Sequence, residues 1–127
     1  MKVADTSYLV EGILRDASIF ENETFVAPDI ALYEVANTIW KHETLIGDLK
    51  DSSIRLNMFA ELVSNQTIEL VMPDKKLLDQ TFQLSIRHRT PVYDAVFVAL
   101  ALRLGLELKT FDEKQSLTLL KERRTNN

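Results

Sequence analysis

One stretch of the chain constrains the fold more than any other. Residues 91–102 carry a single charged side chain, Asp94, among apolar ones. The pattern predicts a helix over 92–104, with Thr90 at its cap, Pro91 at its first helical position and a glycine just beyond its end. A helix that is apolar on nearly every face is a buried helix. The rest of the chain must therefore supply layers that cover it.

Short apolar segments alternate with helical ones along the chain. Strands are predicted at 3–4, 24–27, 67–72 and 106–111, and helices at 8–14, 29–45, 49–64, 75–87, 92–104 and 113–122. Such alternation gives right-handed crossovers and a mostly parallel sheet. We therefore expect an α/β fold in a single domain, residues 1–127, in which Asp29 caps the second helix and residues 121–127 form a frayed basic tail.

The composition excludes some classes of protein. The chain has no cysteine, so disulfides and thiolate metal sites are excluded, and no apolar run reaches the roughly 18 residues of a membrane span. An acidic residue, Asp5, follows the start at once, which does not fit a secretory signal. These features predict a cytoplasmic protein. The net charge of −4 argues against a surface that binds nucleic acid everywhere, but an acidic site that gathers cations fits it.

Asp94 is the most informative residue in the sequence. An unpaired buried carboxylate is costly and normally takes up a proton instead. Asp94 therefore needs a cation, either an Arg or Lys side chain or a metal ion. The alternative is that it lies at the helix end and simply favours the helix dipole.

Asp5 and Asp112 follow the first and last predicted strands. Functional residues gather at the carboxyl ends of parallel strands, although either aspartate also fits a helix cap, and Gln115 completes a capping-box pattern with Asp112. Glu34 lies on a polar helical stripe, and that stripe fits either a solvated face or the wall of an acidic cleft.

Convergence of these four carboxylates would give a coherent chemistry. Hard cations such as Mg²⁺ or Mn²⁺ prefer oxygen ligands, and they polarise a phosphodiester and activate water. The hydroxyls of Thr6, Ser7 and Thr110 stand close by in sequence and are candidate contacts for water or phosphate.

Four segments together resemble the successive motifs of PIN domains, and more narrowly those of VapC-type toxins. The segments are 3–7 (VADTS), 28–37 (PDIALYEVAN), 93–101 (YDAVFVALA) and 108–112 (LKTFD). Each motif alone is degenerate, but their order, spacing and coverage of the chain make the combined match specific. The resemblance implies a PIN-like α/β/α sandwich around a parallel sheet of four to five strands.

The same resemblance implies a function and a site. Asp5, Glu34, Asp94 and Asp112 map onto the acidic metal-binding and catalytic set of the family. The implied activity is Mg²⁺- or Mn²⁺-dependent endoribonuclease cleavage of RNA by the toxin of a type II toxin–antitoxin pair. The implied partners are a cognate antitoxin and a second copy of the chain in a homodimer.

The sequence departs from the family pattern in two places. Relatives often carry another acidic or amide residue after the last Asp, and here the candidates, Glu113 and Gln115, match poorly. A fifth strand after that Asp is hard to find. The basic cluster 87–89 (RHR) fits either contact with RNA phosphates or a solvated helix end.

Two other functions fit parts of the pattern. One is a catalytically silent PIN-fold module that binds RNA or protein, although the four intact carboxylates argue against it. The other is a phosphoryl-transfer or receiver-type domain that uses Lys109, but the sequence lacks a second aspartate two positions after Asp5.

Overall fold

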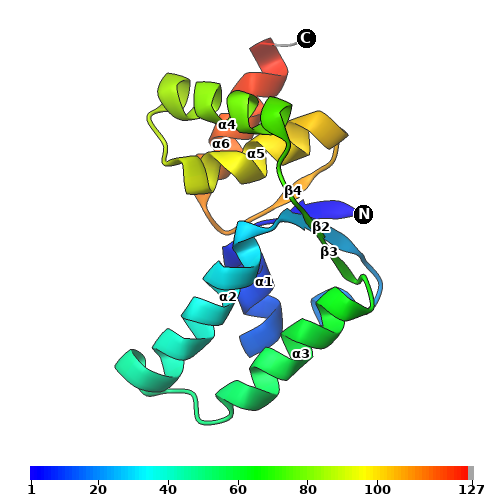
Figure 1. The fold of residues 1–127 in the computed structure, drawn as a ribbon, viewed down its shortest axis with the longest axis vertical. Coiled ribbons are helices and arrows are strands. Elements are labelled where there is room, and N and C mark those ends of the chain that lie inside the picture. Colours follow the sequence, from blue (N-terminus) through cyan, green and yellow to red (C-terminus); the bar gives the residue numbers. More distant parts are fainter. Residues whose placement is uncertain (126–127) are drawn as a thin grey trace.

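A four-stranded parallel sheet forms the centre of the molecule (Figure 1). The computed structural model describes residues 1–125 and places the strands β1 (Lys2–Ala4), β2 (Phe25–Pro28), β3 (Ile68–Val71) and β4 (Leu108–Lys109) in the order β3-β2-β1-β4. Val3 is paired with Val26 on one side and with Leu108 on the other. The predicted α/β class and parallel sheet are confirmed, with four strands in the described residues.

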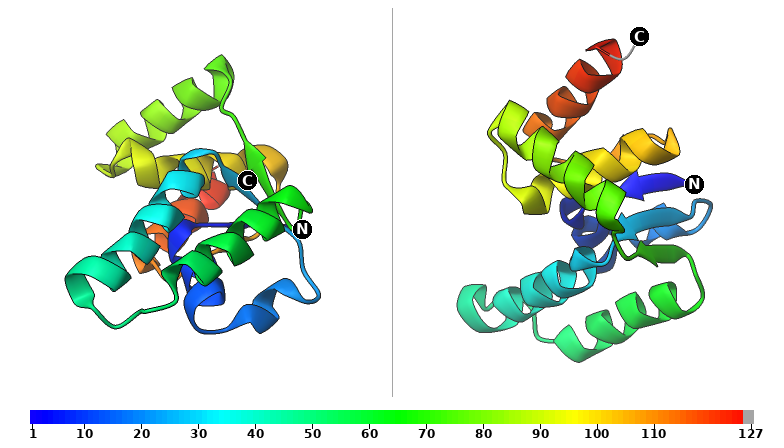
Figure 2. Two further views of the ribbon diagram at one scale, coloured as in Figure 1. Left: turned by 60° about the horizontal axis from the view of Figure 1, so that its bottom comes forward. Right: turned by 45° about the horizontal axis from the view of Figure 1, so that its top comes forward.

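Helices cover both faces of this sheet. They are α1 (Thr6–Leu14), α2 (Ile30–Lys41), α3 (Ser52–Ser64), α4 (Lys75–His88), α5 (Val92–Leu104) and α6 (Glu113–Thr125). In Figure 1 the helices α1, α2 and α3 lie below the sheet and α4, α5 and α6 lie above it. The two views of Figure 2 show the same separation into layers. None of the helices in residues 1–125 is long and apolar enough to cross a membrane.

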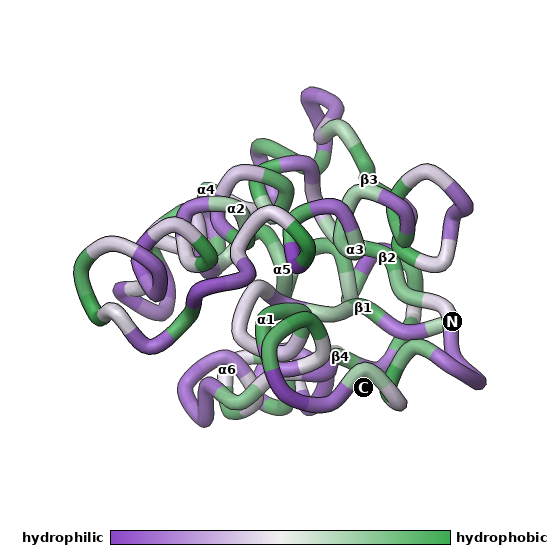
Figure 3. The backbone as a smooth tube through the Cα atoms, turned by 90° about the horizontal axis from the view of Figure 1, so that it is seen from below, coloured by the Kyte–Doolittle hydropathy of each residue, from purple (hydrophilic) through white to green (hydrophobic). Residues whose placement is uncertain are grey.

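The strands contribute side chains to two separate hydrophobic cores, because successive side chains of a strand point to opposite faces of the sheet. Ala4 and Phe25 pack with α1, α2 and α3, whereas Val3 and Val26 pack with α4, α5 and α6. Figure 3 shows the corresponding hydrophobic colouring of β2 and β3 and the hydrophilic outer loops. Residues 95–101 of α5 are all buried, as the apolar pattern predicts.

Two of the predicted helix caps are wrong. Asp29 makes no capping bond with its side chain, because its φ and ψ are already helical whereas a capping residue is extended. Its backbone N–H donates to the Val71 carbonyl (2.9 Å). Thr90 does not cap α5 either. Pro91 takes the cap position, and the Thr90 carbonyl accepts a hydrogen bond from the Ser85 hydroxyl.

The C-terminal residues 121–125, expected as a frayed tail, are instead the last turns of α6. Glu122 is buried and accepts hydrogen bonds from Arg87 Nε (3.0 Å) and Nη2 (2.8 Å), and its Oε1 lies 2.8 Å from His88 Nε2. Arg123 donates to the Leu106 carbonyl. These contacts hold α6 on α4 and on the segment before β4, and they explain why the helix extends further than its charged sequence indicates. The rest of the expected tail, 126–127, lies outside the described residues.

Candidate functional site

The strand order brings two of the candidate carboxylates together. The chain proceeds from β1 to β2 and β3 on one side, and β4 then pairs with the other side of β1. Such a switch point leaves a crevice outside the carboxyl ends of the strands, where parallel α/β sheets bind ligands. Asp5 directly follows β1, and Asp112 follows β4 after Thr110 and Phe111.

Asp5 is fixed by three donors. Its side chain is 3% exposed, and its Oδ1 accepts from the Tyr8 backbone N–H (3.0 Å) and from Ser7 Oγ (2.6 Å). Its Oδ2 accepts from the Thr110 hydroxyl, whose oxygen in turn accepts the Asp112 N–H (2.8 Å). Asp5 therefore caps α1, as one of its two sequence interpretations held, and it also ties the end of β1 to the end of β4.

Glu34 projects from the second turn of α2 toward the same edge. Its Oε1 accepts a hydrogen bond of 2.8 Å from Thr6 Oγ1 in the first turn of α1. Burial raises the pKa of Glu34, the Thr6 bond opposes this, and the charges of Asp94 and Asp5 raise the pKa further. The side chain is therefore half-buried and within the field of the other carboxylates, which a fully solvated stripe would not show.

Asp94 lies in the first turn of α5 and experiences the same crowding of negative charge. Its pKa is raised by burial first and then by the charges of Asp112 and Asp5, whereas Lys114 and a side-chain hydrogen bond with Gln115 lower it. No ion pair to Asp94 occurs within residues 1–125. The cation that the sequence predicted for this carboxylate is thus not a paired Arg or Lys of the described chain.

The four carboxylates influence one another through their charges, but their side chains do not converge on a single point. Glu34 is influenced by Asp94 and Asp5, and Asp94 by Asp5 and Asp112. Across the described residues, no three Asp, Glu or His side chains form a compact ligand group, and hydroxyls occupy oxygens of Asp5 and Glu34. The donor set is all oxygen and strongly negative, and this combination suits a hard divalent cation.

A family model described as PIN domain matches residues 2–118. This chain belongs to the PIN domain family. It is 38% identical over 86 residues to Ribonuclease VapC3 of Pyrobaculum aerophilum, a match that covers 68% of this chain and 64% of that protein's length. The crystal structure of PAE2754 from Pyrobaculum aerophilum has the same fold, with a TM-score of 0.76 at 19% identity over 92% of this chain and 78% of that one.

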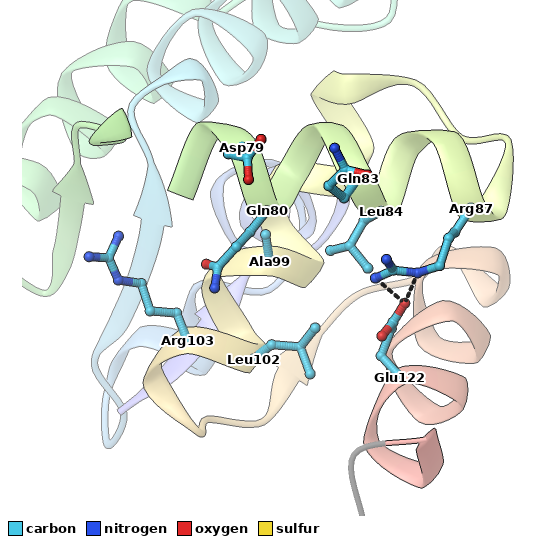
Figure 4. Close-up of a pocket in the computed structure, with 9 residues that line it drawn as sticks. All are labelled: Asp79, Gln80, Gln83, Leu84, Arg87, Ala99, Leu102, Arg103 and Glu122. Carbon is cyan, nitrogen blue, oxygen red and sulfur yellow. Dashed lines mark hydrogen bonds and ion pairs between the residues drawn. The ribbon is translucent and has the colours of Figure 1, made fainter. Parts of the chain in front are cut away.

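This PIN domain also contains a hollow that lies apart from the four carboxylates. Its volume is about 440 Å³, and it is enclosed by α4, α5 and the end of α6 (Figure 4). Arg87 at its rim binds Glu122, and Arg103 binds Asp74 with two hydrogen bonds of 2.8 and 2.7 Å. Because both arginines are neutralised by carboxylates, this hollow has no evident attraction for an anion.

The basic cluster 87–89 is divided between two roles. Arg87 and His88 contact Glu122, as Figure 4 shows for the arginine, and so they serve to attach α6. Arg89 is exposed, and its backbone is left-handed (φ 50°), a rare conformation for a residue with a side chain. Its carbonyl accepts a hydrogen bond of 3.1 Å from Lys114 Nζ, and the charge of Lys114 lowers the pKa of Asp94.

Sequence reasoning missed Lys114 and underrated Gln115. The buried positions of α6 are Gln115, Thr118, Leu119 and Glu122, spaced as one helical face. Three of these four residues are polar, which is unusual for a face that packs on a core. That composition was the available signal that α6 meets polar groups of the protein and not only apolar ones.

Proposed function

We propose that this PIN domain is a metal-dependent endoribonuclease that hydrolyses RNA phosphodiester bonds as the toxin of a type II toxin–antitoxin pair. The observation that carries the proposal is the gathering of Asp5, Glu34, Asp94 and Asp112 at one edge of the sheet, where burial and then the charges of neighbouring carboxylates raise the pKa values of Glu34 and Asp94. The similarity of this chain to a protein named Ribonuclease VapC3 supports RNA as the substrate.

The four carboxylates are the residues that would hold Mg²⁺ or Mn²⁺. When bound, the ion makes its water more acidic and neutralises charge on the phosphate. Asp5 is set in place by Ser7 and Thr110, and Glu34 by Thr6. These hydroxyls, predicted as contacts for water or phosphate, first serve to orient the carboxylates. Contact with substrate remains a prediction for them.

Lys114 and Arg89 are the cations that we assign to the RNA backbone. Both are exposed, and Lys114 is close enough to Asp94 to lower the pKa of its carboxyl. Neither side chain forms an ion pair within residues 1–125. Cations beside the acidic site would hold phosphates without neutralising the metal ligands.

The proposal includes a cognate antitoxin and a homodimer, which follow from the similarity to VapC-type toxins. An exposed apolar stripe on α4, formed by Leu78, Phe82 and Ile86 at 53–58% exposure, offers a surface for protein contact. Its spacing of four residues gives a continuous apolar line along one side of the helix.

The test is cleavage of a labelled RNA pool by the purified protein in EDTA, Mg²⁺ or Mn²⁺. We expect cuts in Mg²⁺ or Mn²⁺, none in EDTA and none with Asp94→Asn. Asp79→Asn, an exposed carboxylate on α4 away from the four, is the matched control and should cleave as the wild type does. Cleavage that persists in EDTA or in the Asp94 variant would contradict the proposal. Binding of RNA without cleavage would favour the silent module instead.

A further inference from the structure

The three most exposed aromatic residues of the described chain each directly precede one of the four carboxylates. They are Tyr33, Tyr93 and Phe111, at 70%, 63% and 62% exposure. The two tyrosines lie on helices, where the side chains of neighbouring residues leave the axis about 100° apart. Phe111 instead lies in the loop between β4 and α6, and its own contacts show how its ring is held.

The main chain around Phe111 is fixed to the acidic site. Its backbone N–H donates to Ser7 Oγ (3.1 Å), and that hydroxyl donates to Asp5 Oδ1 (2.6 Å). The Thr110 hydroxyl donates to Asp5 Oδ2 and accepts the Asp112 N–H (2.8 Å). The bonds that orient Asp5 therefore also set the position of Phe111.

The ring of Phe111 is supported from behind by a second aromatic ring. The planes of Phe111 and Tyr8 are 24° from parallel, with their centroids 5.6 Å apart. Tyr8 packs in turn against Phe25, which is buried in the core. Aromatic pairs prefer such offset and tilted arrangements to a face-to-face sandwich. Because Phe111 stays 62% exposed with Tyr8 behind it, the side of the ring away from Tyr8 is open to a ligand.

A rigid aromatic surface that is open to solvent is complementary to a nucleic-acid base. Proteins hold unpaired bases by stacking them on such side chains, and any base can stack because every base has a π-face. A ring that is already fixed loses little conformational entropy when the base arrives. Phe111 is one residue from Asp112, so the base that it meets belongs to a nucleotide beside the phosphate at the carboxylates.

We propose that Phe111, backed by Tyr8, is a stacking platform for an unpaired RNA base next to the cleaved bond. The inference rests on the proposed nuclease function and adds substrate recognition to it. Lys114 and Arg89 would hold the phosphates, and Phe111 would hold the base. The RNA is then bound as a single strand at this point, and a duplex of the same sequence is a poorer substrate.

The experiment replaces Phe111 with leucine, which still covers Tyr8 but has no π-face, and with tryptophan, which has a larger one. The matched control is Trp40→Leu, at an exposed aromatic residue in the last turn of α2, six residues after Glu34. All three are made in the full-length Asp94→Asn chain, so that RNA is not cut during the titration. Thermal unfolding of each variant is measured in parallel.

Two labelled strands are titrated in Mg²⁺ by fluorescence anisotropy. One is oligo(U), and the other is an abasic ribose-phosphate strand of the same length, which has the phosphates but no base to stack. We expect Phe111→Leu to weaken oligo(U) binding about 5- to 100-fold and Phe111→Trp to retain it. Trp40→Leu should change the affinity by less than about twofold. The abasic strand should bind equally with and without the Phe111→Leu substitution.

Cleavage kinetics provide a second measurement. In the otherwise wild-type chain, Phe111→Leu should raise KM for RNA by a similar factor and leave kcat unchanged. A base beside the reacting phosphate is held equally in the ground state and in the transition state, so its loss removes uniform binding.

Unchanged oligo(U) affinity in Phe111→Leu would overturn the stacking role and favour a protein contact at this ring. Equal losses for oligo(U) and the abasic strand would also overturn it, because they would show a structural role. Either result leaves the nuclease proposal intact if the wild type cleaves RNA in Mg²⁺ or Mn²⁺. Oligo(U) binding that depends on Phe111, in a chain that cleaves no RNA, would support the platform and overturn the nuclease.

Discussion

Replacing Asp5 with alanine is expected to abolish RNA cleavage and also to lower the free energy of unfolding by about 2–3 kcal/mol. The lost helix cap at the Tyr8 N–H contributes about 1 kcal/mol. The hydroxyls of Ser7 and Thr110 each lose a buried acceptor, at about 1 kcal/mol apiece. For a chain of this length the melting temperature should fall by roughly 10 °C.

Asp94→Asn should abolish cleavage without this loss of stability. Burial and the charges of Asp112 and Asp5 raise the pKa of Asp94, so the folded state binds its proton more tightly than the unfolded chain does. Ionisation of this carboxylate therefore opposes folding: the penalty begins above the ordinary aspartate pKa and is complete above the raised one. Because Asp94 is partly exposed, solvent screening keeps the gain from the asparagine below about 1 kcal/mol at neutral pH. The gain should vanish below about pH 4, where both states are protonated.

The assay is urea unfolding of the wild type and both variants at pH 4 and pH 7, without divalent metal. At pH 7 we expect Asp5→Ala to lower the free energy of unfolding and Asp94→Asn to raise it slightly, although both variants should lose RNA cleavage. An Asp5→Ala variant as stable as the wild type would refute the structural role of the Asp5 network. Destabilisation by Asp94→Asn greater than about 1 kcal/mol would refute the repulsion among the four carboxylates.

Three further perturbations test other parts of the structure. Mn²⁺ at about 100 times its Kd should stabilise the wild type by about 2.7 kcal/mol in thermal unfolding, and Asp94→Asn should show little of this gain. Gly12→Ala should lower the free energy of unfolding by about 1 kcal/mol in the same assay, because the added Cβ would lie 2.4 Å from Ile19 Cδ1 and 2.5 Å from Phe20 Cε2. Unchanged stability would show that these two side chains move aside at little cost. Glu122→Gln should cost about 1–2 kcal/mol at pH 7 in urea unfolding. Burial opposes ionisation of Glu122, but hydrogen bonds from His88 and Arg87 lower its pKa overall. The stability that ionised Glu122 contributes is therefore present above the ordinary glutamate pKa and is lost as the pH falls. An equal loss of stability in Glu122→Gln at pH 3 would contradict this.

Much of the fold can be predicted from the sequence, because the strongest patterns in this sequence extend over many residues. The apolar run of α5 permits only a buried helix, and residues 95–101 are buried as expected. Single-residue signals were weaker. Asp29 has the right chemistry for a cap, but its backbone is already helical, and so its side chain makes no capping bond. The last turns of α6 carry charges typical of a solvated tail, and only the positions of Arg87 and His88 on α4 make Glu122 a buried anchor.

Some residues of the candidate site could likewise be predicted from the sequence, and others could not. Strand ends and an isolated charge in an apolar helix indicate Asp5, Asp112 and Asp94 without knowledge of tertiary structure. Glu34 could not be separated from a solvated stripe, because its partner Thr6 lies 28 residues earlier in the chain. Gln115 fitted a capping box with Asp112, yet it lies close enough to Asp94 on another helix to lower the pKa of that carboxyl. Interactions between distant segments leave no periodic trace in a single sequence.

Asp5 shows that the bonds of a helix cap can also hold a candidate metal ligand in one orientation. The capping bond to Tyr8 and the bond from Ser7 fix Oδ1, while Thr110 fixes Oδ2 from the neighbouring strand. A carboxylate held at both oxygens keeps one orientation, and a fixed ligand loses little conformational entropy when it binds an ion. The contacts that stabilise the start of α1 thus also fix the orientation of this candidate ligand. For an aspartate at a strand end, a capping pattern is therefore no argument against the metal-binding role that we propose for the same residue.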